Sequence, residues 1–250
     1  SFAYSVFIEE GASGRAAVTD LPQYAGRSGL HIRGTSSSNF PKKQYKFETW
    51  DEFNEDKNVS LLGLPAESDW ILQGPYSDKA LMRNHLTYQW AREMGHYATR
   101  TRFVEAFINT GGGPVSQADY VGVYMLMESI TRDDERVDIA ELDPSDDSEP
   151  EITGGYVLEK TSANRRPVDP NQYFESDLGY YFTYQDPKYF ELTDVQKDYI
   201  ENYVEGFEDV LYGPNFTDPD TGYAAWIDVD SFIDYELISQ LTRNNDAWFD

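Results

Sequence analysis

The period of the hydrophobic pattern changes along this 250-residue chain, and that change limits the folds open to it. Up to about residue 130, apolar residues mostly alternate with small or polar ones, which is typical of β-strands. After about residue 190, apolar residues recur at the spacing of an α-helix. A run of strands followed by helices predicts an α+β fold with two lobes.

The same pattern places the individual elements. Strands are expected at Ser1–Ile8, Leu30–Arg33, Gln44–Phe47, Asp69–Leu72, Phe103–Asn109, Tyr120–Met127 and Gly155–Lys160. Helices are expected from Ser77 or Asp78 to Gly95, and over Asp194–Leu211 and Asp230–Arg243. The glycine-rich turn after Asn109 predicts a hairpin between its two flanking strands. Residues 164–186 show no clear period and carry no prediction.

Charge is unevenly distributed. Residues 1–110 hold 12 basic and 13 acidic side chains, whereas residues 111–250 hold 8 and 32. Because such an acidic surface repels the phosphate backbone of a nucleic acid, we expect no nucleic-acid partner. The excess favours solubility in a salty or extracellular setting, and a cation site built from carboxylates is the alternative.

Other features exclude several classes of protein. The longest apolar stretch, Tyr120–Met127, is far shorter than the roughly 20 residues of a transmembrane helix, so no membrane span is expected. With no cysteine, the chain has no disulfide, zinc thiolate or cysteine nucleophile. The three histidines, His31, His85 and His96, lack metal-ligand spacing.

A loop of small hydroxylated residues is the strongest local signal for chemistry. Arg33 and Gly34 precede Thr35 and three serines that include Ser36 and Ser37, and Lys42, Lys43 and Lys46 follow. Backbone N–H groups of such a loop can approach an anion closely, and lysines can reach phosphate oxygens. The loop does not match the Walker pattern. The alternative is a flexible serine-rich hairpin with surface lysines.

Three further positions stand out. Arg83 interrupts the apolar stripe of the first helix and needs a carboxylate or phosphate if it is buried. Glu128 ends a buried strand, where main-chain groups can read a planar base. Asp246 follows the last helix beside two asparagines, which suits a proton acceptor or a metal ligand, although an asparagine C-cap explains that segment equally well.

In combination these segments resemble the CotH kinase family, known from spore-coat proteins. The matching blocks, in order, are Ile32–Ser37, Phe40–Tyr45, Asp69–Leu72 with Tyr76–Asn84, Arg102–Glu105, Gly122–Glu128, Gly155–Glu159, and Asp228–Tyr235 continuing to Asn245 and Asp246.

The resemblance implies a two-lobed, atypical protein-kinase-like fold, with residues 1–130 as an N-terminal, mostly β lobe and 131–250 as a helical C-terminal lobe of one domain. It also implies ATP with Mg²⁺ or Mn²⁺ as cofactors and serine or threonine of secreted or surface proteins as acceptor. The chain itself is expected to be secreted or at the cell surface, as in a spore coat. Lys43 or Lys42 would contact the phosphates, with Arg33, Ser36, Ser37 and Arg83 completing the nucleotide site.

On this interpretation Glu128 marks a hinge beside the adenine, and Asp246 orients the acceptor hydroxyl. Lys43 is preferred because it shares strand parity with Tyr45 and Phe47. The main metal-binding aspartate of the family is expected beyond Asp250, so the chain is expected to be truncated there. Two alternatives stay open: a non-catalytic coat scaffold or surface adhesin with the kinase-like fold, and a glycoside hydrolase with paired carboxylates.

Overall fold

The computed structural model describes residues 1–244 and Ala247. It divides the chain into two compact units: Ser1–Gln89 with Ala98–Ser129, called unit 1, and Trp90–Tyr97 with Ile130–Asp250, called unit 2. The fold is α+β, as predicted. No helix in the described part of the chain is long and apolar enough to cross a membrane.

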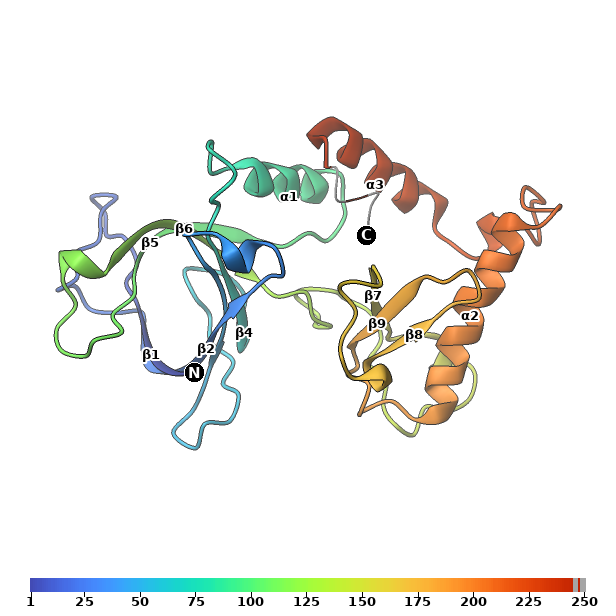
Figure 1. Cartoon of the computed structure of the whole chain (residues 1–250), viewed down its shortest axis with the longest axis horizontal. Coiled ribbons are helices and arrows are strands. Elements are labelled where there is room, and N and C mark those ends of the chain that lie inside the picture. The colour runs from blue at the N-terminus through green and yellow to red at the C-terminus, as the bar shows by residue number, and fades with distance from the viewer. Residues whose placement is uncertain (245–246, 248–250) are drawn as a thin grey trace. The chain divides into compact units, whose positions relative to one another are not determined.

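Unit 1 is built on one six-stranded antiparallel sheet with the strand order β1-β2-β3-β4-β6-β5. Its strands are β1 (Phe2–Phe7), β2 (Tyr24–Arg33), β3 (Gln44–Thr49), β4 (Asp69–Gln73), β5 (Thr101–Phe107) and β6 (Tyr120–Glu128). β5 pairs with β6, which confirms the predicted hairpin. β1 lies at one edge, beside β2 (Figure 1).

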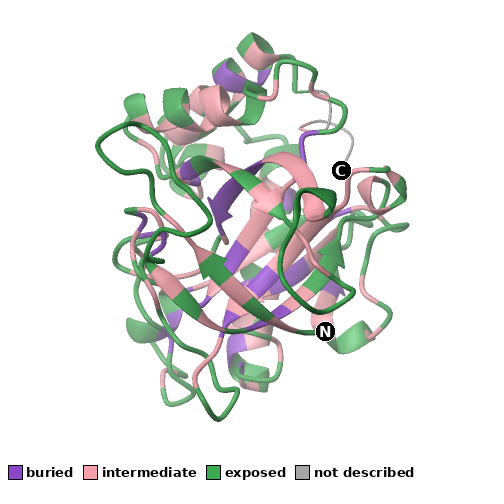
Figure 2. Ribbon diagram, turned by 90° about the vertical axis from the view of Figure 1, so that its left-hand side faces the viewer, coloured by how far each residue is buried: buried purple, intermediate pink, exposed green. Residues whose placement is uncertain are grey.

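The core of unit 1 covers one face of this sheet. Phe47 on β3 is opposite Trp70 on β4, and both are buried. They pack with Leu61 and Leu64, from the segment between β3 and β4, and with Leu126 on β6. Alternate residues of the strands point away from this core, so exposed and partly buried residues alternate along the strands in Figure 2.

Unit 2 combines a three-stranded antiparallel sheet with a long helix. The sheet has the order β7-β9-β8, from Val157–Thr161 (β7), Tyr173–Glu175 (β8) and Tyr181–Asp186 (β9). Helix α2 (Asp194–Tyr212) starts with a capping box made by Thr193 and Gln196. Leu142, Phe174, Tyr184, Leu192 and Ile200 form the buried core.

Two further helices complete the described elements. α1 (Arg83–Glu93) begins about five residues later than predicted, because Leu81 has a φ of 64°, which a right-handed helix does not allow. It is followed by Gly95 at a φ of 95°, which fits the predicted stop. α3 (Val229–Thr242) starts at the N-cap Asp228, whose side chain accepts from two backbone N–H groups.

The two units differ sharply in charge. Unit 1 contains 14 acidic and 11 basic side chains, whereas unit 2 contains 31 and 9. The imbalance seen in the sequence therefore belongs almost entirely to unit 2.

Candidate functional site

The serine loop joins β2 to β3 in a compact turn. Gly34 has a φ of 93°, and a Cβ at this position would lie 2.1 Å from Oγ of Ser37. Residues Ser37–Asn39 form a short 3-10 turn, and the hydroxyl of Ser38 donates to the carbonyl of Thr35 over 2.6 Å. Because only glycine tolerates both the backbone angle and the close contact, Gly34 fixes how the loop folds back.

Lys43 binds the serine loop through its side chain. Its Nζ donates to the carbonyl of Ser38 over 2.8 Å. β3 begins at Gln44, so Lys43 precedes the strand, and the strand-parity reason for preferring it does not apply. The contact of Lys43 with a phosphate stays a prediction.

Lys42 contacts strand β6 instead. Its Nζ donates to the carbonyl of Val123 on β6 and lies 4.5 Å from the ring centroid of Tyr124. Burial lowers the pKa of Lys42, and burial together with Tyr45 raises the pKa of Tyr124 to about 12. Tyr124, which sequence reasoning did not single out, is therefore a neutral aromatic platform beneath an ammonium group.

The two arginines of the predicted site differ in their surroundings. Arg33 is exposed at the end of β2, and its charge lies close enough to Tyr88 on α1 to counteract part of the rise that burial causes in the pKa of that tyrosine. The side chain of Arg83 is 80% exposed, with Nε 3.5 Å from Oδ1 of Asp78.

Asp78 also accepts the backbone N–H groups of Ala80 and Arg83. It therefore holds the turn before α1, but it is not the N-cap expected from the sequence, because the helix begins five residues later, at Arg83. Because Arg83 is exposed, the reason given for a buried partner does not apply to it. Its role in binding a nucleotide stays a prediction.

Glu128 is fully buried at the end of β6 and is bound by Arg100. Its Oε1 accepts from Nε of Arg100 at 2.8 Å, and Oε2 accepts from the backbone N–H of the same residue at 2.8 Å. The carboxylate therefore anchors Arg100, the residue that immediately precedes β5. The chain leaves unit 1 just after this point, at Ser129. Sequence reasoning missed Arg100, which is 28 positions away from Glu128.

The proposed catalytic segment lies at the limit of the described chain. α3 ends at Arg243, which has a left-handed φ of 53° and acts as its C-cap, and the N–H of Asn244 donates to the carbonyl of Ser239 over 3.0 Å. Asp246 lies outside the described residues. Among the residues that are described, no group of three or more histidine, aspartate and glutamate side chains is arranged to hold a metal ion.

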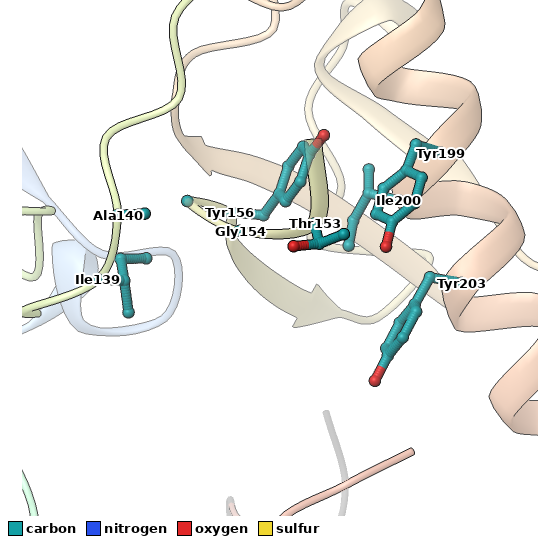
Figure 3. Close-up of a pocket in the computed structure, with 9 residues that line it drawn as sticks. Ile139, Ala140, Thr153, Gly154, Tyr156, Tyr199, Ile200 and Tyr203 are labelled. Carbon is teal, nitrogen blue, oxygen red and sulfur yellow. The ribbon is translucent and has the colours of Figure 1, made fainter. Parts of the chain in front are cut away.

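A cavity of about 440 Å³ lies in unit 2. Its lining includes Thr153 and Tyr156 on one side and Tyr199 and Tyr203 of α2 on the other (Figure 3). The buried hydroxyl of Tyr156 has no hydrogen-bond partner within the described residues, and burial with the nearby Tyr199 raises its pKa to about 12. None of the residues predicted for the nucleotide site lines this cavity.

A comparison with models of known protein families tests the resemblance noted in the sequence. A family model described as CotH kinase protein matches residues 30–249, which confirms the resemblance over most of the chain. No curated protein matches the chain. β1 and the first part of β2 lie before the matched residues.

Proposed function

The chain belongs to the CotH kinase family, and on that premise we propose that it is an atypical protein kinase. It transfers the γ-phosphoryl group of ATP to serine or threonine of secreted or surface proteins. The observation that supports this most is the pairing of the serine loop with Lys42 and Lys43 in unit 1. Lys43 binds the loop directly, and Lys42 binds the strand that ends at Glu128.

The side chains of this region suit a polyphosphate. The serine loop offers small side chains and backbone N–H groups, and the two lysines add positive charge in a unit that is nearly neutral. Positive groups fixed beside the phosphates stabilise the negative charge that spreads over the transferred group. Each lysine donates to one carbonyl, and an ammonium group has three N–H donors, so a phosphate can bind beside that carbonyl.

Asp246 is proposed to accept the proton of the acceptor hydroxyl. In that step the hydroxyl oxygen bonds to the γ-phosphorus, the bond from phosphorus to the bridging oxygen breaks, and ADP leaves. Kinase chemistry uses a divalent ion that neutralises charge on the phosphates, and Asp246 would help to hold it. Among the described residues, no group of three or more histidine, aspartate and glutamate side chains is arranged around such an ion.

Two measurements test the proposal separately. Equilibrium binding of ATP in magnesium buffer should weaken at least tenfold in Lys43→Ala and in Lys42→Ala. Lys57→Ala removes the same charge from an exposed loop of unit 1 and should leave binding unchanged. Equal affinity in all four proteins would remove the serine loop from the site.

Transfer of labelled phosphate to a serine-containing protein should occur with the unchanged chain and be lost in Asp246→Asn, while ATP binding is kept. If transfer persists after this substitution, a group other than Asp246 accepts the proton of the acceptor hydroxyl. A folded chain that neither binds ATP nor transfers phosphate would favour the alternative of a coat scaffold or adhesin.

A further inference from the structure

The edge strands of the two sheets are protected unequally. β5, the edge opposite β1 in the large sheet, contains Arg102 and Glu105 and has a bulge between Ala106 and Phe107. β7 contains Glu159 and Lys160, and β8 ends at Glu175. Charges and bulges on an edge strand prevent it from pairing with another chain.

β1 has neither form of protection. Its sequence, FAYSVF, contains no charged residue, no proline and no bulge relative to β2. Of the four edge strands in the described sheets, it is the only one without a charge. Such an edge readily accepts another strand.

The exposed side chains of β1 are apolar and share one face. Phe2, Tyr4 and Val6 are 63%, 66% and 52% exposed, whereas Ala3, Ser5 and Phe7 are partly buried. The carbonyls of Ser1 and Phe7 accept from the β2 side, at Leu30 and Gln23. By the alternation of an antiparallel ladder, the backbone groups of Phe2, Tyr4 and Val6 point to the open edge.

We propose that β1 pairs with β1 of a second copy of this chain, antiparallel and centred on Tyr4. In that register Phe2 is opposite Val6 of the partner subunit, and Tyr4 is opposite Tyr4 of the partner subunit. Each of these pairs can exchange both backbone hydrogen bonds. The three exposed apolar side chains of one copy then meet the same three of the other, so the contact is self-complementary.

The distribution of charge favours a second copy at this position. The strand itself is uncharged, and unit 1 carries 14 acidic against 11 basic side chains, so pairing at β1 brings little like charge together. Contact between two copies of unit 2, which has 31 acidic and 9 basic side chains, would be strongly repulsive. β1 also precedes the residues matched by the family model, so the pairing is separate from the proposed phosphoryl transfer.

The area that β1 can bury in this dimer is small. A stable interface buries about 800 Å² per partner, and a six-residue strand covers less than that. We therefore expect a dimer that dissociates on dilution. Sedimentation velocity over a series of concentrations should show this equilibrium, and Tyr4→Lys should weaken it at least tenfold.

A matched control is Phe53→Lys, which places the same charge at an aromatic side chain that is 74% exposed in a loop. This variant should dimerise like the unchanged chain. Circular dichroism of Tyr4→Lys should match that of the unchanged chain, since the Tyr4 side chain is mostly exposed. A chain that is monomeric at every concentration, or a dimer unaffected by Tyr4→Lys, would overturn the proposal.

The absence of native cysteine allows a direct test of register. With Tyr4→Cys, a short bis-maleimide should cross-link two copies rapidly, because the two thiols lie at the centre of the pairing. With Phe2→Cys the two thiols are four residues apart along the strands, about 13 Å, and cross-linking should be at least tenfold slower. Equal rates for the two variants would refute the register.

Discussion

Lys42 combines a partly buried side chain with a formal charge. Its ammonium group lies over the ring of Tyr124 and donates to a backbone carbonyl, and no carboxylate is among its recorded contacts. Cation–π contact and one hydrogen bond compensate only part of the lost hydration, which is why burial lowers the pKa of Lys42.

This lowered pKa should make Lys42 unusually reactive. At a mildly alkaline pH a larger fraction of its amine is uncharged than at an ordinary lysine, so an amine-acylating reagent should modify Lys42 at a lower pH than Lys57. Mass spectrometry of peptides after brief labelling across a pH series measures this order. ATP should protect Lys42 and Lys43 but not Lys57. Half-maximal labelling of Lys42 at a higher pH than Lys57 would contradict the expected environment.

The ion pair of Glu128 with Arg100 should matter for stability. Glu128→Gln removes the charge that balances a partly buried guanidinium, and we expect the free energy of unfolding to fall by about 2 to 3 kcal/mol. Urea-induced unfolding measures the difference. Asp134→Asn, which breaks an exposed ion pair with Arg132, should cost less than about 0.5 kcal/mol. Equal effects of the two substitutions would show that burial does not strengthen the first pair.

At the scale of elements, the hydrophobic period located the strands and helices whose formation depends on their own residues. The periods of the sequence located all six strands of the large sheet and the three helices, although β2 begins at Tyr24, six residues before its predicted start. β8 and β9 were not predicted: both lie in residues 164–186, which show no clear period, and the three residues of β8 form a strand by pairing with β9. The late start of α1 likewise depends on a turn at Leu81, whose left-handed φ no residue preference indicates.

The candidate site was predictable to a similar extent. Composition located the serine loop and its lysines, since small residues and clustered charge are local properties. It did not show which lysine faces which neighbour, because Lys42 binds a carbonyl 81 positions away. Arg100 was missed for the same reason, as its partner is on another strand.

Helix α2 fixes part of the acidic segment of residues 133–151. Gln196, which is 1% exposed, donates through Nε2 to the carbonyls of Asp143 and Asp146, at 2.7 and 3.1 Å. Its Oε1 also closes the capping box with Thr193.

Gln196→Ala should therefore loosen that segment and lower stability by about 2 to 3 kcal/mol, because the carbonyls of Asp143 and Asp146 lose the donor that the buried amide of Gln196 supplies. Limited digestion with a glutamate-specific protease should cut residues 133–151 at least tenfold faster than in the unchanged chain. Gln240→Ala, on an exposed face of α3, should leave the cutting rate unchanged. An unchanged rate in Gln196→Ala would mean that other contacts hold the segment.

At the scale of the whole molecule, alkaline pH should destabilise both units. The pKa values of Tyr124 in unit 1 and Tyr156 in unit 2 are raised from 10.0 to about 12. Because the folded-state pKa exceeds the unfolded value, their contribution to stability is complete below about pH 10 and is lost as the pH rises through about 12.

Urea unfolding at a series of pH values should therefore show a falling midpoint above pH 10. In Tyr156→Phe the fall should be smaller, because phenylalanine does not ionise. Its stability at neutral pH should change little, since the hydroxyl that is removed has no partner among the described residues. A midpoint that falls as steeply in this variant would mean that other groups cause the alkaline loss.

The contrast in charge between the units has a practical consequence for the choice of buffer. Dissolved ions weaken the mutual repulsion of carboxylates over roughly 10 Å at 0.1 M. Unit 2 should gain from concentrated electrolyte, while a polyphosphate bound by lysines in unit 1 would be released by it. No single ionic strength would then favour both the stability of unit 2 and the binding of a polyphosphate by unit 1.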